Sequence, residues 1–143
     1  MIEQVVCLVR GGEAGRFTQE QAIDYARQTG RKIVFLHIIT PGGFQLENED
    51  LLEPVLKEQT WLARVNLGQA RQRAERRGMK GETAIRMGPF VETVLTYVQE
   101  QPVDRVYLGK PRQDTEDYEQ RLARINAFIK RLADEGSVEA VVV

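Results

Sequence analysis

Three basic side chains could bind an anion together if the fold places them at one edge of a sheet. Arg10 follows the apolar run 5–9, and Lys110 and Arg112 follow the apolar run 106–108. A guanidinium binds phosphate or carboxylate through paired hydrogen bonds, whereas an ammonium acts as a point charge. Open parallel sheets bind ligands where the carboxyl ends of adjacent strands meet. The candidate anion or nucleotide site therefore consists of Arg10, Gly11, Gly109, Lys110 and Arg112.

The segment that leads from these basic residues into the next predicted helix carries four carboxylates: Asp114, Glu116, Asp117 and Glu119. Negative charge is favourable at a helix N-terminus, so this acidic cluster takes the electrostatic position that a bound phosphate would occupy. Arg10 and Arg112 could instead form ion pairs with the cluster, since exposed ion pairs form readily although each contributes little. The sequence leaves open both a true anion site and a salt-bridged surface.

Glycines are missing where a nucleotide-binding loop would need them. After Gly109 no glycine follows until Gly136, so the backbone cannot approach a pyrophosphate closely. Gly11, Gly12 and Gly15 follow the first apolar run, but their spacing is G-G-x-x-G and no helix is predicted directly after them. This pattern is a weak match to a dinucleotide-binding fingerprint.

Two other reactive residues are interpreted as structural. His37, the only histidine, lies within the apolar run 33–39, and no serine or cysteine nucleophile with an orienting acid accompanies it. We therefore expect it to pack or to hydrogen-bond to the backbone. Cys7 is the only cysteine and lies in an apolar run, which indicates a small core residue and excludes an intramolecular disulfide. No catalytic or metal-binding residues are predicted.

The composition predicts a single domain over residues 1–143. Twenty basic and 21 acidic residues nearly cancel, so the chain exerts no strong long-range attraction on nucleic acid or on an anionic membrane. No apolar run approaches the ~18 residues that a membrane span needs, and the N-terminus lacks the features of a secretory leader. We expect a cytoplasmic protein with neither a nucleic-acid nor a membrane partner.

Apolar runs and helical periodicity alternate along the chain. The runs 5–9, 33–39 and 106–108 are almost continuously apolar, which is typical of strands buried on both faces of a parallel sheet. The segment 82–87 mixes charged and apolar residues, which favours a strand at the sheet edge, and 138–143 closes the chain as a fifth strand.

Four helices are predicted between these strands. Thr18 and Gln21 have capping-box spacing and open the first helix, which ends at Gly30. The others span about 54–77, 90–101 and 118–136, the last ended by Gly136. The order of elements is β-α-β-α-β-α-β-α-β, which right-handed crossovers turn into a doubly wound α/β fold with helices on both faces.

The second predicted helix collects arginines in its C-terminal half, at Arg64, Arg71, Arg73, Arg76 and Arg77. A basic patch for nucleic acid is one interpretation. Complementation of the helix dipole explains the same pattern, since the acidic residues come early in this helix, and no aromatic residues are interleaved to stack on bases. We favour the second interpretation.

These patterns resemble the universal stress protein (UspA) family over essentially the whole chain. The resemblance rests on VVCLV, QAIDYARQTG, IVFLHII, GETAIRMGPFVETVLTYVQEQPVDRVYLGK and the closing VEAVVV. The longest of these blocks contains a strand, a Gly-Pro turn, an amphipathic helix and a strand that ends in Leu-Gly. The resemblance implies a five-stranded parallel sheet of order 3-2-1-4-5, which agrees with the edge position of 82–87.

ATP-binding members of this family have a glycine loop that the chain matches only at Gly109. Arg112 stands where the second glycine would be, and Leu122 and Ala123 stand where a glycine followed by Ser or Thr would be. Arg10 replaces an Asp that these members tend to carry after the first strand. The resemblance therefore implies the fold, whereas the missing motif argues against ATP or AMP, and we expect no cofactor.

The function predicted from the sequence is that of a regulatory or protective binding module that is neither an enzyme nor a conventional ATP binder. The alternative is a nucleotide- or anion-binding switch, or a weak ATPase, that uses Arg10, Lys110 and Arg112 in place of the glycines. A third interpretation is a structural subunit that requires an unknown protein partner.

The closing strand predicts a homodimer. Its apolar residues are Val138, Ala140, Val141, Val142 and Val143, and Glu139 is its only charged residue. An exposed apolar edge strand is an aggregation hazard unless it is paired, and two such strands can pair antiparallel about a twofold axis, as the resemblance to dimeric family members also implies. We expect one of Val141 and Val142 to face outward and the other to face the core. The alternative is a monomer with a short exposed edge strand.

Overall fold

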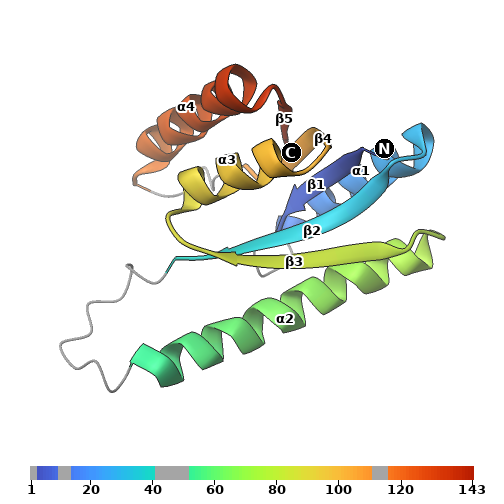
Figure 1. The fold of residues 1–143 in the computed structure, drawn as a ribbon, viewed down its shortest axis with the longest axis horizontal. Coiled ribbons are helices and arrows are strands. Elements are labelled where there is room, and N and C mark those ends of the chain that lie inside the picture. The colour runs from blue at the N-terminus through green and yellow to red at the C-terminus, as the bar shows by residue number, and fades with distance from the viewer. Residues whose placement is uncertain (1–2, 10–13, 41–51, 111–115) are drawn as a thin grey trace.

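The computed structural model describes residues 3–9, 14–40, 52–110 and 116–143, and strands and helices alternate along them (Figure 1). The elements are β1 (Gln4–Leu8), α1 (Ala14–Thr29), β2 (Lys32–Ile39), α2 (Leu52–Arg76), β3 (Gly81–Met87), α3 (Phe90–Glu100), β4 (Val103–Leu108), α4 (Tyr118–Gly136) and β5 (Glu139–Val142). The predicted order of elements is confirmed.

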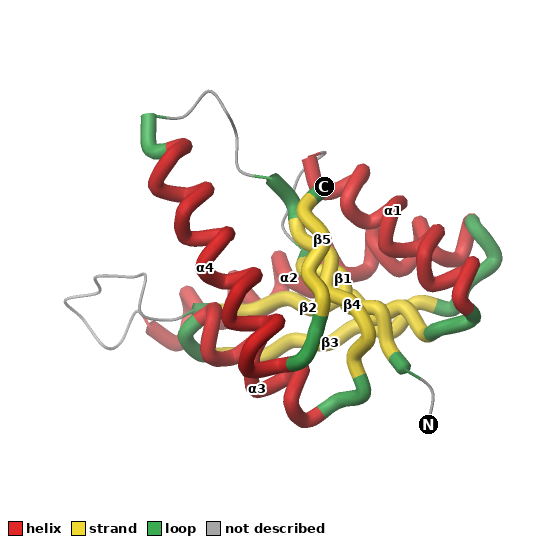
Figure 2. Tube along the Cα trace, turned by 90° about the horizontal axis from the view of Figure 1, so that it is seen from above, coloured by secondary structure: helices red, strands yellow, loops and turns green. Residues whose placement is uncertain are grey.

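The strands form one sheet of order β3-β2-β1-β4-β5, in which every neighbouring pair is parallel. Helices α1 and α2 cover one face, and α3 and α4 cover the other, as the view from above shows (Figure 2). The doubly wound α/β fold is confirmed, and β3 lies at an edge of the sheet as its mixed composition predicted. None of the helices in the described ranges is long and apolar enough to cross a membrane.

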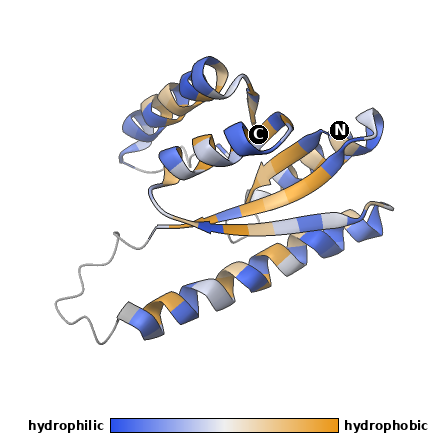
Figure 3. Ribbon diagram, viewed as in Figure 1, coloured by the Kyte–Doolittle hydropathy of each residue, from blue (hydrophilic) through white to orange (hydrophobic). Residues whose placement is uncertain are grey.

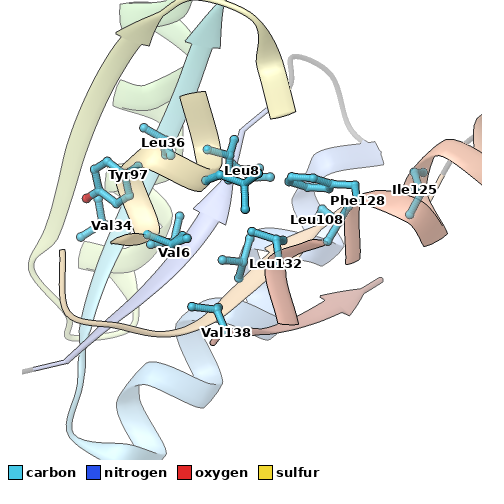
Figure 4. Packing of buried hydrophobic residues seen from close by; sticks show 14 residues of the cluster. Val6, Leu8, Val34, Leu36, Tyr97, Leu108, Ile125, Phe128, Leu132 and Val138 are labelled. Carbon is cyan, nitrogen blue, oxygen red and sulfur yellow. The ribbon is translucent and has the colours of Figure 1, made fainter. Parts of the chain in front are cut away.

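The core is divided by the sheet into two clusters. Side chains alternate along β1, so Val6 and Leu8 join the cluster beneath α3 and α4, whereas Val5 and Cys7 join the cluster beneath α1 and α2. Figure 4 shows the first cluster, with side chains from the strands meeting those from α3 and α4. The apolar residues of α3 and α4 pack on the sheet. On α2, however, Leu62 and Val65 are exposed, and Ala63, Leu67 and Ala70 form the buried face.

The N-terminus of α1 differs from its prediction. The helix begins at Ala14, so Thr18 lies one turn inside it and does not cap it. Residues of the added turn contribute an ion pair to the helix, since Arg16 Nε lies 3.0 Å from Glu20 Oε1 one turn later. The correction matters because it turns Thr18 toward the sheet, where it is 2% exposed.

The C-terminus of α4 also differs in detail. Gly136 is the last residue of the helix, and the left-handed residue is Ser137, with φ of 54°. A glycine is nevertheless needed at 136, because a Cβ there would lie 2.8 Å from Val98 Cγ2 of α3. The close approach of two helices, and not the backbone angle, explains this glycine. Gly30 does have the positive φ predicted for the end of α1.

Candidate functional site

The predicted site lies where β1 and β4 end side by side in the sheet. Arg10, Gly11 and Arg112 fall outside the residues that the structure describes, so their positions remain predictions. Gly109 and Lys110 are described, and they follow the last residue of β4. The N–H of Lys110 donates to Val143 O at 2.9 Å, which ties this end of β4 to β5.

Lys110 supplies an uncompensated positive charge at this edge. Its side chain is exposed, and no carboxylate lies within ion-pair distance of its ammonium among the described residues. Because its backbone is fixed by β5, the lysine is anchored at the carboxyl end of β4 while its ammonium remains available. This arrangement is what the predicted anion site requires of Lys110.

Thr18 adds a polar group that the sequence did not reveal. Its hydroxyl is buried and has no hydrogen-bond partner in the described part of the chain. A Cβ built on Gly109 would lie 3.5 Å from Thr18 Oγ1, so α1 approaches the end of β4 closely at this point. A buried hydroxyl without a partner is costly, and here it stands beside Gly109 at the end of β4.

The acidic cluster is partly engaged at the start of α4. Asp117 Oδ2 lies 2.9 Å from Arg121 Nε, one turn along the helix. Glu119 lies in the first turn, where its charge favours the helix dipole. Asp114 lies outside the described residues. The described part of the cluster thus contains an ion pair with a helix neighbour, and pairing of the cluster with Arg10 or Arg112 stays a prediction.

A cavity of about 400 Å³ opens between α3 and α4 beside the end of β4. Two arginines of α4 and several apolar residues line it: Arg121, Arg124, Phe90, Val91, Leu108, Ile125 and Phe128. The ring centroids of Phe90 on α3 and Phe128 on α4 lie 5.5 Å apart, and the ring planes are tilted by 53°. A cavity of this size lies within the range of small-molecule sites.

The two arginines of this α3–α4 cavity differ in their pairing. Arg121 is paired with Asp117, whereas Arg124 is exposed and has neither an ion pair nor a hydrogen bond within the described ranges. Arg124 therefore gives the cavity a net positive charge above an apolar lining. An anion with an apolar or aromatic part matches both features. The sequence did not reveal this cavity, because apolar residues spaced along α4 are also what packing on the sheet requires.

His37 and Cys7 do not contribute chemistry to the site. His37 Nδ1 lies 3.0 Å from the backbone oxygen of Val9, which confirms the expected hydrogen bond to the backbone. Burial raises the pKa of the Cys7 thiol to about 12, so the thiol is protonated at neutral pH and is not a nucleophile. Within the described residues, no group of histidine, cysteine or carboxylate side chains could hold a metal ion.

Comparison with known proteins gives a consistent result. A family model described as the universal stress protein family matches residues 1–143. A search of curated proteins finds no match.

Among solved structures, universal stress protein UspA from Lactobacillus plantarum is similar with a TM-score of 0.79 and 16% identity, over 99% of this chain and 97% of that one. A universal stress protein in complex with cAMP has a TM-score of 0.71 and 18% identity, over 99% of this chain and 96% of that one. The universal stress protein from Archaeoglobus fulgidus in complex with dAMP has a TM-score of 0.64 and 15% identity, over 99% of this chain and 97% of that one. At these identities the likeness shows the fold.

Replacing Thr18 by valine tests whether its hydroxyl lacks a partner. Valine has nearly the same shape, so Thr18→Val removes a buried polar group without leaving a cavity, and we expect the free energy of unfolding to rise by about 1 kcal/mol. Urea unfolding of the purified protein measures this change. The control is Thr60→Val. The Thr60 hydroxyl donates to Leu56 O at 2.8 Å, so its removal should not raise the free energy of unfolding. A loss of stability in Thr18→Val would show that the hydroxyl is hydrogen-bonded.

Proposed function

Because the chain belongs to the universal stress protein family, we propose that it is a non-enzymatic binding module with a regulatory or protective role, which does not bind ATP through the glycine loop of its ATP-binding relatives. The single observation that carries this proposal is the α3–α4 cavity, which is lined by Arg124, an arginine without an ion pair among the described residues. It offers a recognition site for a small molecule, and in the described part of the chain no group of histidine, cysteine or carboxylate side chains could hold a metal ion.

The chemistry of the α3–α4 cavity selects the class of ligand. Phe90 and Phe128 favour an aromatic or apolar group, and Arg124 favours a single phosphate, sulfonate or carboxylate. A triphosphate is a poor match, because its extra charges would lie near the acidic cluster at the start of α4. The proposed ligand is therefore a compact aromatic or apolar anion that carries one charged group.

A second candidate function is a nucleotide- or anion-binding switch, or a weak ATPase, that uses Arg10, Lys110 and Arg112. Lys110, which is exposed and has no ion pair in the described part of the chain, favours it, as do the relatives whose structures hold cAMP and dAMP. The buried Thr18 hydroxyl beside Gly109 would give such a ligand a hydrogen bond. The two candidates differ in which arginine binds the anion, so they can be separated by mutation.

We also propose a homodimer that pairs through β5. Among the strands that the structure describes, β4 is its one neighbour in the sheet. Val143 N–H donates to Leu108 O at 2.9 Å, and alternate residues of a parallel strand direct their backbone groups to the same side. The backbone groups of Ala140 and Val142 therefore face the open edge. A second β5 strand can satisfy them.

The side chains of Val141 and Val142 in β5 do not lie as the sequence predicted. Val142 packs partly against the cluster beneath α3 and α4, whereas Val141 and Val143 pack against the cluster on the other face. Both faces of the sheet are covered, so neither Val141 nor Val142 faces outward as was expected of one of them. A lysine at either position would therefore disturb the core, and the dimer has to be tested through the backbone.

The charge chemistry of the acidic cluster predicts weak binding of ATP. We expect a dissociation constant no better than about 1 mM, and we expect Arg112→Gly not to improve it, because the carboxylates still repel the triphosphate. Isothermal titration calorimetry of both proteins measures this. A wild-type dissociation constant below about 10 μM, roughly −7 kcal/mol, would contradict the first candidate function and favour the second.

The aromatic sulfonate 8-anilinonaphthalene-1-sulfonate is a suitable fluorescent probe of the α3–α4 cavity. We expect the folded protein to bind it at neutral pH, and we expect Arg124→Ala to weaken binding by about tenfold, as for the loss of one charge-assisted hydrogen bond. The matched control is Arg27→Ala, which removes an exposed arginine without an ion pair from α1 on the other face of the sheet. Equal weakening of probe binding by the two variants, or no binding of the probe to the folded protein, would contradict the proposed site.

Proline at position 142 tests the dimer. Val142→Pro removes a backbone N–H that faces the open edge and leaves the hydrogen bonds between β4 and β5 intact, so we expect it to shift a dimer to a monomer. Sedimentation velocity at micromolar concentration measures the mass, and Val142→Ala is the control for the lost side chain. A wild-type protein that sediments only as a monomer refutes the dimer.

A further inference from the structure

The sheet has a second open edge, at β3, whose surroundings differ from those of β5. Figure 1 shows β3 as the outermost strand, with α2 running alongside it. The strand pairs with β2 over seven residues, and none of the described strands lies on its other side. An open strand edge presents unpaired N–H and C=O groups to whatever approaches it.

The backbone groups that face this edge can be assigned. Gly88 N–H donates to Ile39 O at 2.9 Å, which places Gly88 in the set of alternate residues that bond to β2. The even-numbered residues of β3 belong to the same set. The N–H and C=O groups of Thr83 and Ile85 therefore point away from β2, toward the open edge.

A groove of about 380 Å³ runs between this edge and α2. Its described lining is Arg64, Leu67, Gly68, Arg71 and Thr83 to Ile85. Leu67 is buried and forms part of its floor. A Cβ at Gly68 would meet no atom within 4 Å, so the helix surface beside the strand is open. The groove thus has a backbone edge on one side and free space above the helix on the other.

The charge of this β3 groove is positive. Arg64 and Arg71 are exposed, lie two helical turns apart on α2, and have no ion pair in the described part of the chain. Other arginines near the C-terminus of α2 are engaged by α1, where Arg73 donates to Gln19 and Arg77 pairs with Asp24. No carboxylate is among the described residues that line the groove. The hydropathy view shows the mixed polar character of α2 and β3 here (Figure 3).

We propose that the β3 groove is a docking site for an extended acidic segment of a partner protein, which adds to the sheet as a sixth strand. Strand addition satisfies the outward backbone groups of Thr83 and Ile85, and this supplies affinity without regard to sequence. Same-face side chains of the added strand recur about every 7 Å, so acidic residues at alternate positions can reach both Arg64 and Arg71. The arginines thereby supply the selectivity for an acidic segment.

A second copy of this chain is a poor occupant of the same groove. If two β3 strands paired antiparallel about a twofold axis, each α2 would bring its own Arg64 and Arg71 to the same face of the joined sheet. Four unpaired guanidinium groups would then be crowded together, which disfavours this pairing. An acidic partner meets the same two arginines favourably.

The probe for this site is a fluorescein-labelled eight-residue peptide of alternating glutamate and valine, and the reference is its lysine–valine counterpart. We expect the acidic peptide to bind at least tenfold more tightly in fluorescence anisotropy. The double variant Arg64→Ala/Arg71→Ala should weaken its binding about tenfold. The control Arg27→Ala/Arg76→Ala removes two other exposed arginines and should change binding less than twofold.

Amide hydrogen exchange, followed by NMR, locates the bound peptide. We expect binding to slow exchange at Thr83 and Ile85, whose N–H groups face the edge, and to leave Ala84 unchanged. Equal binding of the two peptides, equal effects of the two double variants, or protection at β5 instead of β3 overturns the proposal. Protection of Thr83 and Ile85 in the free protein that disappears on dilution also overturns it, in favour of a second copy.

Discussion

Complete burial of β1 is the constraint on which the rest of the structure depends. All five of its residues are buried, with Val6 and Leu8 under α3 and α4 and with Val5 and Cys7 under α1 and α2. Because helices cover both faces of the sheet, the buried strands are closed to a ligand along most of their length. Recognition is therefore confined to the ends of the strands, the gap between α3 and α4, and the two open edges. The same burial makes Cys7 chemically inert, since it raises the pKa of the thiol to about 12.

The charges at the start of α4 determine which of its first two arginines lacks a partner in the described part of the chain. The start of α4 is favourable for negative charge, and Asp117 and Glu119 already supply it. Asp117 also takes up Arg121. Arg124, one turn further along α4, has no such partner within the described residues and lies over apolar side chains. A ligand that needs a cation is thereby directed to the gap between α3 and α4, where few backbone groups but two aromatic rings are available.

The fold could be predicted from the sequence because its signals are local and repeated. Continuous apolar runs mark strands covered on both faces, and a mixed run marks the edge strand β3. The start of α1 was missed because its first turn includes Gly15 and Arg16, which carry no apolar periodicity. Ser137 was missed because a left-handed residue after a helix is usually glycine, whereas Gly136 is fixed by its contact with α3.

The α3–α4 cavity could not be predicted, because it depends on the spacing between two helices, which is set by tertiary packing and not by a local pattern of residues. Nothing in the local sequence separates Arg124 from any other solvated arginine on a helix. Gly109 and Lys110 could be proposed from the sequence because they follow a strand, and the ends of parallel strands are brought together by the topology itself. Groups whose place is set by the strand topology can thus be predicted from the sequence, whereas groups whose place is set by helix packing cannot.

The two open edges of the sheet are chemically distinct, and this distinction decides what each can bind. At β5 the one charged side chain, Glu139, lies 3.1 Å from Arg105 of the neighbouring strand, so the edge carries little net charge and tolerates an identical strand. At β3 the arginines of α2 are unpaired in the described ranges and repel an identical strand. Because three strands separate β3 from β5, the partners of the two edges do not compete for space. The edge proposed for self-pairing and the edge proposed for an acidic partner can therefore be occupied at once, which would let one domain join a second copy of itself to an acidic partner.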